Sequence, residues 1–277
     1  MPREPLSPTE ERESALAFLE AGQDFGVGLA GGAAGMIGGP LGVVAGAGAA
    51  VAAKRTFQRL GAVVRRRWLD PAEEHRAAGA FGLALEEINR RIEGGERLRD
   101  DGFFADEDNG RSAGEELLEG MLRAAAGAYE ERKVPFLANA YASLAFRPDI
   151  GRPYANFLIR LIDGLGWRQV VLLGYVATNA EVRDFATANS GAPIPPPEPP
   201  EAVFAELDAL GAQDLIAVVQ QNGTLAPWRT VMGEGFREIG IGRARLTRIG
   251  SDLSELMRLS QLPPIDLHEI FETISRA

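Results

Sequence analysis

An uncharged, glycine-rich segment between Phe25 and Ala53 most constrains what this chain can fold into. Asp24 stands directly before the segment, and Lys54 and Arg55 follow it. Many of its glycines recur four residues apart, a spacing that puts them on one face of a helix. Such a smooth face lets two helix backbones approach closely, and in lipid this contact replaces the missing hydrophobic drive between helices. The segment therefore indicates a helix that packs tightly against another, in a membrane or in an assembly.

The spacing and the proline define a set of candidate residues for membrane contact and oligomerisation. They are Gly28, Gly31, Gly32, Gly35, Gly38, Gly39, Pro40, Gly42 and Gly46. The segment resembles the glycine zippers of bacterial membrane proteins, especially the two-helix kind in which Gly-Gly-Pro-Leu-Gly forms the central turn. The resemblance implies a close-packed helical hairpin with its turn at residues 38–42, and it says little about activity.

Two topologies and one soluble alternative stay open for this segment. As a single helix it exceeds the ~20 apolar residues needed to cross a bilayer. As two helices broken at Gly39 and Pro40, each arm is too short for a full span and would insert shallowly, or span only within an oligomer. In the soluble alternative the hairpin is buried beneath the rest of the protein, although each helical glycine costs roughly 1 kcal/mol relative to alanine.

The charge reverses after the glycine segment, where the chain becomes basic and amphipathic. The candidate lipid-headgroup residues are Lys54, Arg55, Arg59, Arg65, Arg66, Arg67 and Trp68. Beside an apolar segment, such a stretch is typical of an anchor on anionic lipid, which attracts each basic residue by ~1 kcal/mol near the surface. The alternative is a solvated helix face that pairs with the protein's surplus acids.

Composition and charge limit which partners this protein can bind and in which cellular compartment it is expected. The net charge of −10 at pH 7 disfavours nucleic acid as a partner, because phosphates repel an acidic protein. The chain has no cysteine, which excludes disulfides and thiolate metal sites. Residues 1–24 are acidic, unlike a secretory signal. We expect a cytoplasmic protein that associates with the inner membrane, with the basic flank on the cytoplasmic side.

Capping motifs and apolar periodicity predict a mainly α fold. Ser7 and Ser112 each open a capping box with a glutamate three residues later. Residues 1–70 are predicted to hold the first helix, the glycine segment and the basic flank. Residues 71–190 are predicted to form a helical bundle, because successive helices are joined by short loops. The helix after Ser112 has an apolar line that extends to Tyr129.

The sequence from Glu130 to Ala142 is similar to the helical core of bacterial proteins grouped near the abortive-infection alpha family. That resemblance implies a setting in phage defence or stress and identifies no catalytic residue. Asn139 and Tyr141 are expected to be buried polar groups with partners inside the bundle.

A proline-rich stretch at residues 191–200 predicts a linker before a small C-terminal α+β domain at 201–277. Helices are predicted at 202–210 and 213–221, followed by a turn at Asn222 and Gly223, a strand at 241–246 and a helix capped by Thr247. This order resembles a winged-helix domain.

A winged helix can bind DNA or protein, and the charges favour protein. The candidate recognition helix at 213–221 carries no cation, and acids outnumber arginines across 201–277. A small basic wing of Arg243, Arg245 and Arg248 is the feature that would favour DNA. We therefore expect a protein partner at this domain and no nucleic acid.

Motifs for catalysis are lacking. His75 and His268 are the only imidazoles, and no nucleophile elbow, zinc-protease helix or Walker motif occurs. The glycine pattern from Gly26 to Gly31 lacks the preceding strand of a dinucleotide loop. The acidic loop at 100–110 fails as an EF-hand, since Leu117 occupies the position of the bidentate glutamate when Asp106 is position one.

Together these features predict a non-enzymatic effector with no cofactor and no metal site. It would be a homo-oligomer whose partner is an anionic lipid membrane. The alternative is a soluble adaptor that keeps the glycine hairpin buried and binds a protein through its C-terminal domain.

Overall fold

The computed structural model describes residues 7–21, 53–59, 70–107, 110–178, 200–220, 222–228, 243–263, 266–267 and 270. These residues are mainly helical, with a three-stranded antiparallel sheet near the C-terminus. The predicted fold class, a helical bundle with a small C-terminal α+β domain, is confirmed. The chain forms two compact units, Met1–Gly164 and Leu165–Ala277. The zipper glycines, Pro40 and the basic residues from Arg65 to Trp68 lie outside the described residues.

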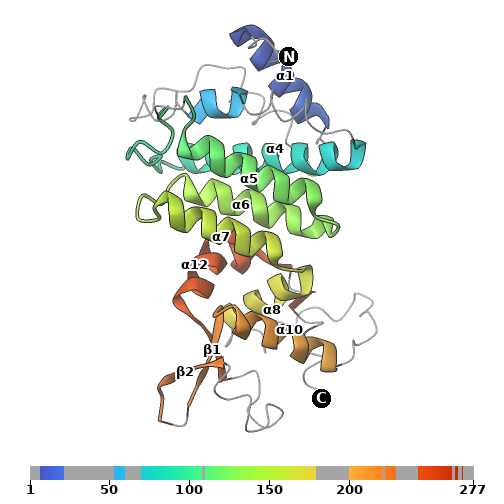
Figure 1. Cartoon of the computed structure of the whole chain (residues 1–277), viewed down its shortest axis with the longest axis vertical. Helices are drawn as coiled ribbons and strands as arrows, with labels where there is room; N and C mark the ends of the chain where they lie inside the picture. Colours follow the sequence, from blue (N-terminus) through green and yellow to red (C-terminus); the bar gives the residue numbers. More distant parts are fainter. Residues whose placement is uncertain are drawn as a thin grey trace. The chain divides into compact units, whose positions relative to one another are not determined.

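The first unit is a stack of helices (Figure 1). α4 packs on α5 and α6, α7 contacts the same two helices, and α1 packs on α4. A further short helix covers residues 53–59. The bounds are α1 Pro8–Ala21, α4 Pro71–Glu93, α5 Ala113–Gly127, the 3-10 turn η2 Glu131–Lys133, α6 Val134–Leu144 and α7 Arg152–Gly164.

Side-chain caps begin these helices where the sequence predicts them. The Ser7 backbone N–H donates to the Glu10 carboxylate at 2.8 Å, and the Glu10 N–H donates to Ser7 Oγ at 3.4 Å. Ser112 Oγ accepts from the Glu115 N–H at 3.1 Å. These bonds satisfy N–H groups that have no partner within the helix. Both predicted capping boxes therefore mark true helix starts.

Cations bind the carbonyls at the C-terminal ends of three bundle helices. Arg76 donates two hydrogen bonds to the Ala126 carbonyl of α5, and Arg99 donates to the Leu144 carbonyl of α6 at 3.2 Å. Lys133 Nζ donates to the Asp163 carbonyl of α7 at 2.5 Å. Each cation faces the negative end of a helix dipole and a carbonyl of the last turn. The bundle thereby satisfies its helix ends with long side chains from neighbouring segments.

The bundle core follows the predicted apolar line of α5 as far as the helix continues. Leu117 and Met121 are fully buried, whereas Tyr129 is 87% exposed. The inclusion of Tyr129 in that line is wrong, because α5 ends at Gly127 and Ala128 has extended backbone angles. Beyond that point the helical period no longer determines which side chains face the core.

The second unit consists of helices packed around the small sheet (Figure 1). The strands are antiparallel in the order β2-β1-β3, with Val218 opposite both Ala226 and Ala244. The bounds are α8 Trp167–Thr178, α10 Pro200–Ala212, β1 Ile216–Val219, β2 Leu225–Pro227, β3 Ala244–Leu246, α12 Arg248–Met257 and the 3-10 turn η6 Leu259–Gln261.

The predicted helix at 213–221 is wrong, because β1 occupies that stretch. The preceding helix stops at a left-handed residue, Asp214, with φ of 56°. The Leu215 N–H then donates to the Leu210 carbonyl and the Asp214 N–H to the Gly211 carbonyl, the bond pair of a Schellman motif. The β-branched residues that follow favour an extended chain. The candidate recognition helix of a winged helix is therefore absent from this position.

The predicted turn and the predicted helix cap of the C-terminal domain agree with the structure, and the predicted strand at 241–246 agrees at Ala244–Leu246. The turn lies at Gly223, whose φ is 81° and whose N–H donates to the Gln220 carbonyl. Thr247 caps α12 by accepting from the Gly250 N–H at 3.1 Å. A Cβ on Gly250 would lie 2.0 Å from the Leu215 carbonyl oxygen, so only glycine permits this close approach of α12 to the chain before β1.

Helix α8 belongs to the second unit. It contacts α10, α12, β3 and η6. The sequence predicts this helix as part of the bundle of residues 71–190, whereas the compact units divide between Gly164 and Leu165. Leu172 and Leu173 are fully buried, so α8 supplies core side chains that the short strands cannot provide. Of the linker at 191–200, only Pro200 is described, as the first residue of α10.

Candidate functional site

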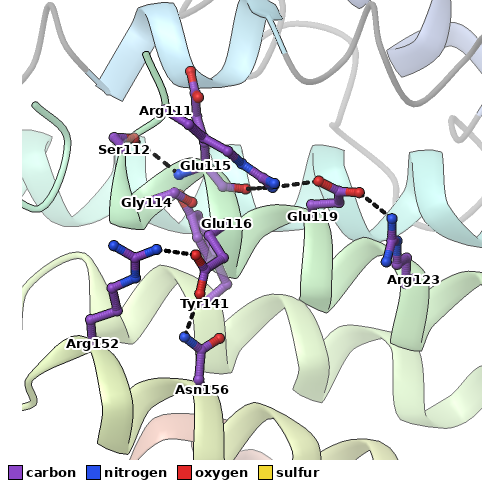
Figure 2. Close-up of polar contacts among 10 residues, drawn as sticks. All are labelled: Arg111, Ser112, Gly114, Glu115, Glu116, Glu119, Arg123, Tyr141, Arg152 and Asn156. Carbon is purple, nitrogen blue, oxygen red and sulfur yellow. Dashed lines mark hydrogen bonds and ion pairs between the residues drawn. The ribbon is translucent and has the colours of Figure 1, made fainter. Parts of the chain in front are cut away.

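Charged side chains gather around the first half of α5 (Figure 2). Glutamates on this helix are paired with arginines from other segments as well as from α5 itself. We call this group the α5 cluster, and its members are Glu115, Glu116, Glu119, Arg59, Arg111, Arg123 and Arg152. It brings together residues that are far apart in the sequence.

Glu115 is the buried member of the α5 cluster. Its side chain is 8% exposed, and a carboxylate oxygen lies 3.5 Å from Arg59 Nη1. Burial raises the pKa of the Glu115 carboxyl, while Arg59 and the Ser112 backbone N–H oppose that rise. The same glutamate thus completes the capping box of α5 and forms an ion pair with Arg59 of the helix at 53–59.

Glu116 has the opposite electrostatic environment. Arg152 of α7 hydrogen-bonds its carboxylate, and Asn156 Nδ2 donates to it at 2.6 Å (Figure 2). The hydrogen bond from Arg152 holds the pKa of Glu116 below its ordinary value. Arg152 also contacts Glu107 at 2.7 Å. This branch connects α5 and α7 with the acidic loop at 100–110.

Glu119 bridges two arginines on the outer side of α5 (Figure 2). One oxygen is bound by Arg111, which precedes the helix, and the other by Arg123, one turn further along. Both arginines are substantially exposed, at 41% and 64%. Exposed pairs of this kind contribute about 0.2–1 kcal/mol each, so this branch adds little to stability.

Tyr141 lies beneath the cluster and is fully buried. Its hydroxyl donates to the Gly114 carbonyl at 3.2 Å, and burial raises the pKa of the phenol. The expectation that Tyr141 is a buried polar group with a partner inside the bundle is confirmed. The expectation that Asn139 is buried is wrong, because this residue is partly exposed.

The geometry of the α5 cluster favours a structural network over a reactive site. Its carboxylates are paired with guanidinium groups, which hold their charge at any physiological pH and cannot exchange protons with a substrate. Among the described residues there is no group of three or more His, Asp or Glu side chains arranged to hold a metal ion. What the network does is join α5, α7, the acidic loop and the helix at 53–59.

Three carboxylates of the acidic loop, those of Asp101, Asp106 and Glu107, form ion pairs. Asp101 pairs with Arg99 at 2.5 Å, and Asp106 pairs with Arg59 at 3.0 Å. Arg99 is itself buried and stacks over the Phe103 ring at 4.3 Å. Asp108 and the residue after it lie outside the described residues.

The described part of the basic segment is the helix at 53–59. One side of this helix is buried: Ala53 and Phe57 are fully buried, and Thr56 is 2% exposed. Arg55 is exposed, Lys54 is partly exposed, and Arg59 forms the ion pairs described above. The structure therefore brings the candidate headgroup residue Arg59 into contact with the carboxylates of Asp106 and Glu115.

An aromatic cluster joins the two sides of the glycine segment. Phe18 of α1 and Phe57 of the helix at 53–59 both pack edge-on against Phe81 of α4, with ring centroids 5.4 and 5.2 Å away. Phe57 also contacts Tyr141 at 5.8 Å. We call these four residues the aromatic clasp. The sequence marks each ring as apolar, but no sequence signal shows that they meet.

The remaining candidates do not assemble into a site. His75 Nδ1 lies 2.7 Å from the Ala21 carbonyl at the end of α1, and the side chain of His268 lies outside the described residues. Arg243 Nε donates to the Val219 carbonyl of β1 at 2.7 Å, whereas Arg245 and Arg248 are exposed. One arginine of the predicted basic wing, Arg243, thus hydrogen-bonds a strand of the sheet.

Comparison with known protein families, with curated proteins and with solved structures gives no match. Among the described residues, no helix combines the length and apolar character needed to cross a bilayer. Helix α4 has 23 residues, but it carries charged side chains in both its first and its last turn.

Proposed function

We propose that this chain is a non-enzymatic, membrane-associated bacterial effector whose glycine segment acts at the inner membrane and self-associates there. The lipid partner is anionic, and the basic flank from Lys54 to Trp68 supplies the attraction. The helical bundle carries the segment and controls its access to lipid. The C-terminal α+β domain is the part proposed to contact a protein partner.

The observation that supports this proposal is the aromatic clasp. Phe18 and Phe57 stand on either side of the glycine segment and pack on the same ring, Phe81. The residues that flank the segment therefore pack at one place on the bundle. A single membrane-spanning helix of this length would separate its ends by the bilayer thickness, about 30 Å for the hydrocarbon core. Clasped ends favour the two-helix arrangement, in which both arms enter from the same face.

Flotation with anionic liposomes tests the proposal. We expect full-length protein to float and a variant lacking residues 25–52 to stay at the bottom of the gradient. Phe18 and Phe57, which flank the deleted stretch, pack on the same ring, and the deletion removes neither of them. Flotation of the deletion variant at the full-length level would refute the proposal.

A double substitution tests the glycine face itself. Gly35→Leu with Gly39→Leu puts bulky side chains where close backbone approach is required, so self-association in liposomes should fall at least about tenfold. Gly127→Leu with Gly164→Leu is the matched control, since a Cβ added at either position would meet open space. Chemical cross-linking in liposomes measures the oligomer. Equal cross-linking of the two double variants would mean that the glycines are not an interface.

A soluble adaptor is the second candidate, and one observation favours it. The apolar side of the helix at 53–59 is already buried within the protein, and Arg59 is already paired with Asp106 and Glu115. A hairpin held against the bundle in the same way would leave the C-terminal domain as the binding surface. Absence of flotation, together with a monodisperse soluble protein, would favour this candidate.

The proposed setting in phage defence or stress rests on the resemblance of residues 130–142 alone. Cells that express the full-length protein should then restrict phage growth, and cells that express the variant lacking residues 25–52 should not. Plating efficiency measures the difference.

A further inference from the structure

The helix at 53–59 could bind a membrane through its apolar side and through the cation Arg59. In the structure both already contact other parts of the protein. An amphipathic helix lies on a membrane by burying its apolar side among the lipids, with cations at the headgroups. Here the apolar side is covered, because Phe57 is fully buried against Phe81 and Tyr141. The Arg59 guanidinium is held by Asp106 and Glu115.

We infer that the docked helix at 53–59 is an autoinhibitory contact, in which Asp106 and Glu115 compete with anionic lipid for Arg59. This inference rests on the proposed membrane function and adds its regulation. The helix lies directly after the glycine segment, so its release would free the basic flank and that side of the segment together. The partners in the docked state are carboxylates, and an arginine binds the phosphate of an anionic lipid headgroup through the same kind of charge-assisted hydrogen bond.

Asp106 is the residue through which this contact can be weakened without disturbing the core. Its side chain is 52% exposed, and it contacts Arg59 Nη1 at 3.0 Å. Glu115 is unsuitable, because it is buried and also completes the cap of α5. Replacing Asp106 with arginine removes the attraction and sets two guanidinium groups against each other.

The adjacent Glu107 provides a matched control. It lies in the same loop, is 47% exposed, and pairs with Arg152 of α7 instead of Arg59. Asp106→Arg and Glu107→Arg change the net charge equally, so any general attraction of the more basic protein to anionic vesicles is the same for both. Only the first variant disturbs the helix at 53–59.

The experiment uses the full chain and vesicles of phosphatidylglycerol and phosphatidylcholine. We expect D106R to partition onto the vesicles about fivefold more strongly than E107R, the size that loss of one partly exposed ion pair allows. Equal partitioning of D106R and E107R, while wild-type protein binds, would overturn the autoinhibitory contact and leave the membrane function standing. If none of the three proteins binds, the proposed function fails and the inference fails with it.

A second measurement needs no lipid. Hydrogen exchange in residues 53–59 should be faster in D106R than in E107R, whereas exchange in α6 should be the same in both. Faster exchange throughout the first unit of D106R would mean general unfolding and would contradict a local contact. Unchanged exchange in residues 53–59 would show that Asp106 does not hold the helix.

Discussion

Glu115 and Glu116 are neighbours in the sequence, yet their surroundings move their pKa values in opposite directions. Burial raises the pKa of Glu115, and the hydrogen bond from Arg152 lowers that of Glu116. Successive residues of a helix point about 100° apart, so Glu115 meets Arg59 of the helix at 53–59 and Glu116 meets Arg152 of α7. A run of two acids therefore contains two groups with different effects on stability.

The pH dependence of stability should separate these two glutamates. A raised native pKa means that the folded protein binds a proton more readily, so the Glu115 carboxylate costs stability as pH rises through that pKa. Glu115→Gln should therefore raise the free energy of unfolding at pH 7, and this gain should disappear as the pH falls below the ordinary pKa of a glutamate. Glutamine also preserves the capping box. Urea unfolding at a series of pH values measures the difference from wild type.

Glu116→Gln is the control with the opposite sign. Its lowered native pKa means that the carboxylate stabilises the fold above the ordinary pKa and loses that effect as pH falls through the lowered value. This variant should be less stable than wild type at pH 7, with the loss shrinking in acid. The same sign for both variants would contradict the opposed environments of the two carboxylates.

At the scale of elements, the helix at 53–59 is held mainly by one aromatic side chain. Phe57 is fully buried and touches both Phe81 and Tyr141. The Arg59 pairs are partly exposed and contribute about 1 kcal/mol or less each. Burial of the Phe57 ring thus supplies most of the free energy that holds the helix on the bundle, and the Arg59 ion pairs add a smaller contribution.

Truncation of Phe57 should therefore detach the helix and weaken the bundle. Phe57→Ala is expected to cost about 3–5 kcal/mol, because it removes a buried ring and leaves a cavity between α4 and α6. Phe157→Ala is the control, since Phe157 is 36% exposed and should cost much less. Hydrogen exchange of α4 reports the stability of this unit. Equal losses in the two variants would contradict the role of the clasp.

At the scale of the whole molecule, the chain divides before α8. The sheet has only three short strands, and α8 contacts β3 as well as α10 and α12. Small sheets require packing against a helix for independent stability. Residues 165–277 therefore hold a complete core, whereas residues 201–277 lack α8.

Two fragments test this division. The fragment 165–277 should unfold cooperatively in urea, because it keeps α8 over the sheet and α12. The fragment 201–277 should lose cooperative unfolding and bind a hydrophobic dye, since the apolar contacts of Leu172 and Leu173 are removed. Cooperative unfolding of the shorter fragment with equal stability would show that α8 is dispensable.

The sequence by itself determined the local elements of this protein. Ser7, Ser112 and Thr247 mark helix starts because a cap depends on residues only three positions apart. The turn at Gly223 depends on one left-handed residue. The mainly α class follows from such signals together with the apolar period.

Only the tertiary structure decided how these elements meet. The sequence predicts a helix at 213–221, whereas the structure has strand β1 there, paired with β2 and β3. The partners of Phe57, Arg59 and Glu115 are distant along the chain, so no local pattern encodes their contacts. Burial, which raised the pKa of Glu115 and gathered the aromatic clasp, exists only once the helices pack. Caps and turns depend on residues a few positions apart, whereas these long-range contacts depend on the free energy of the whole packed unit.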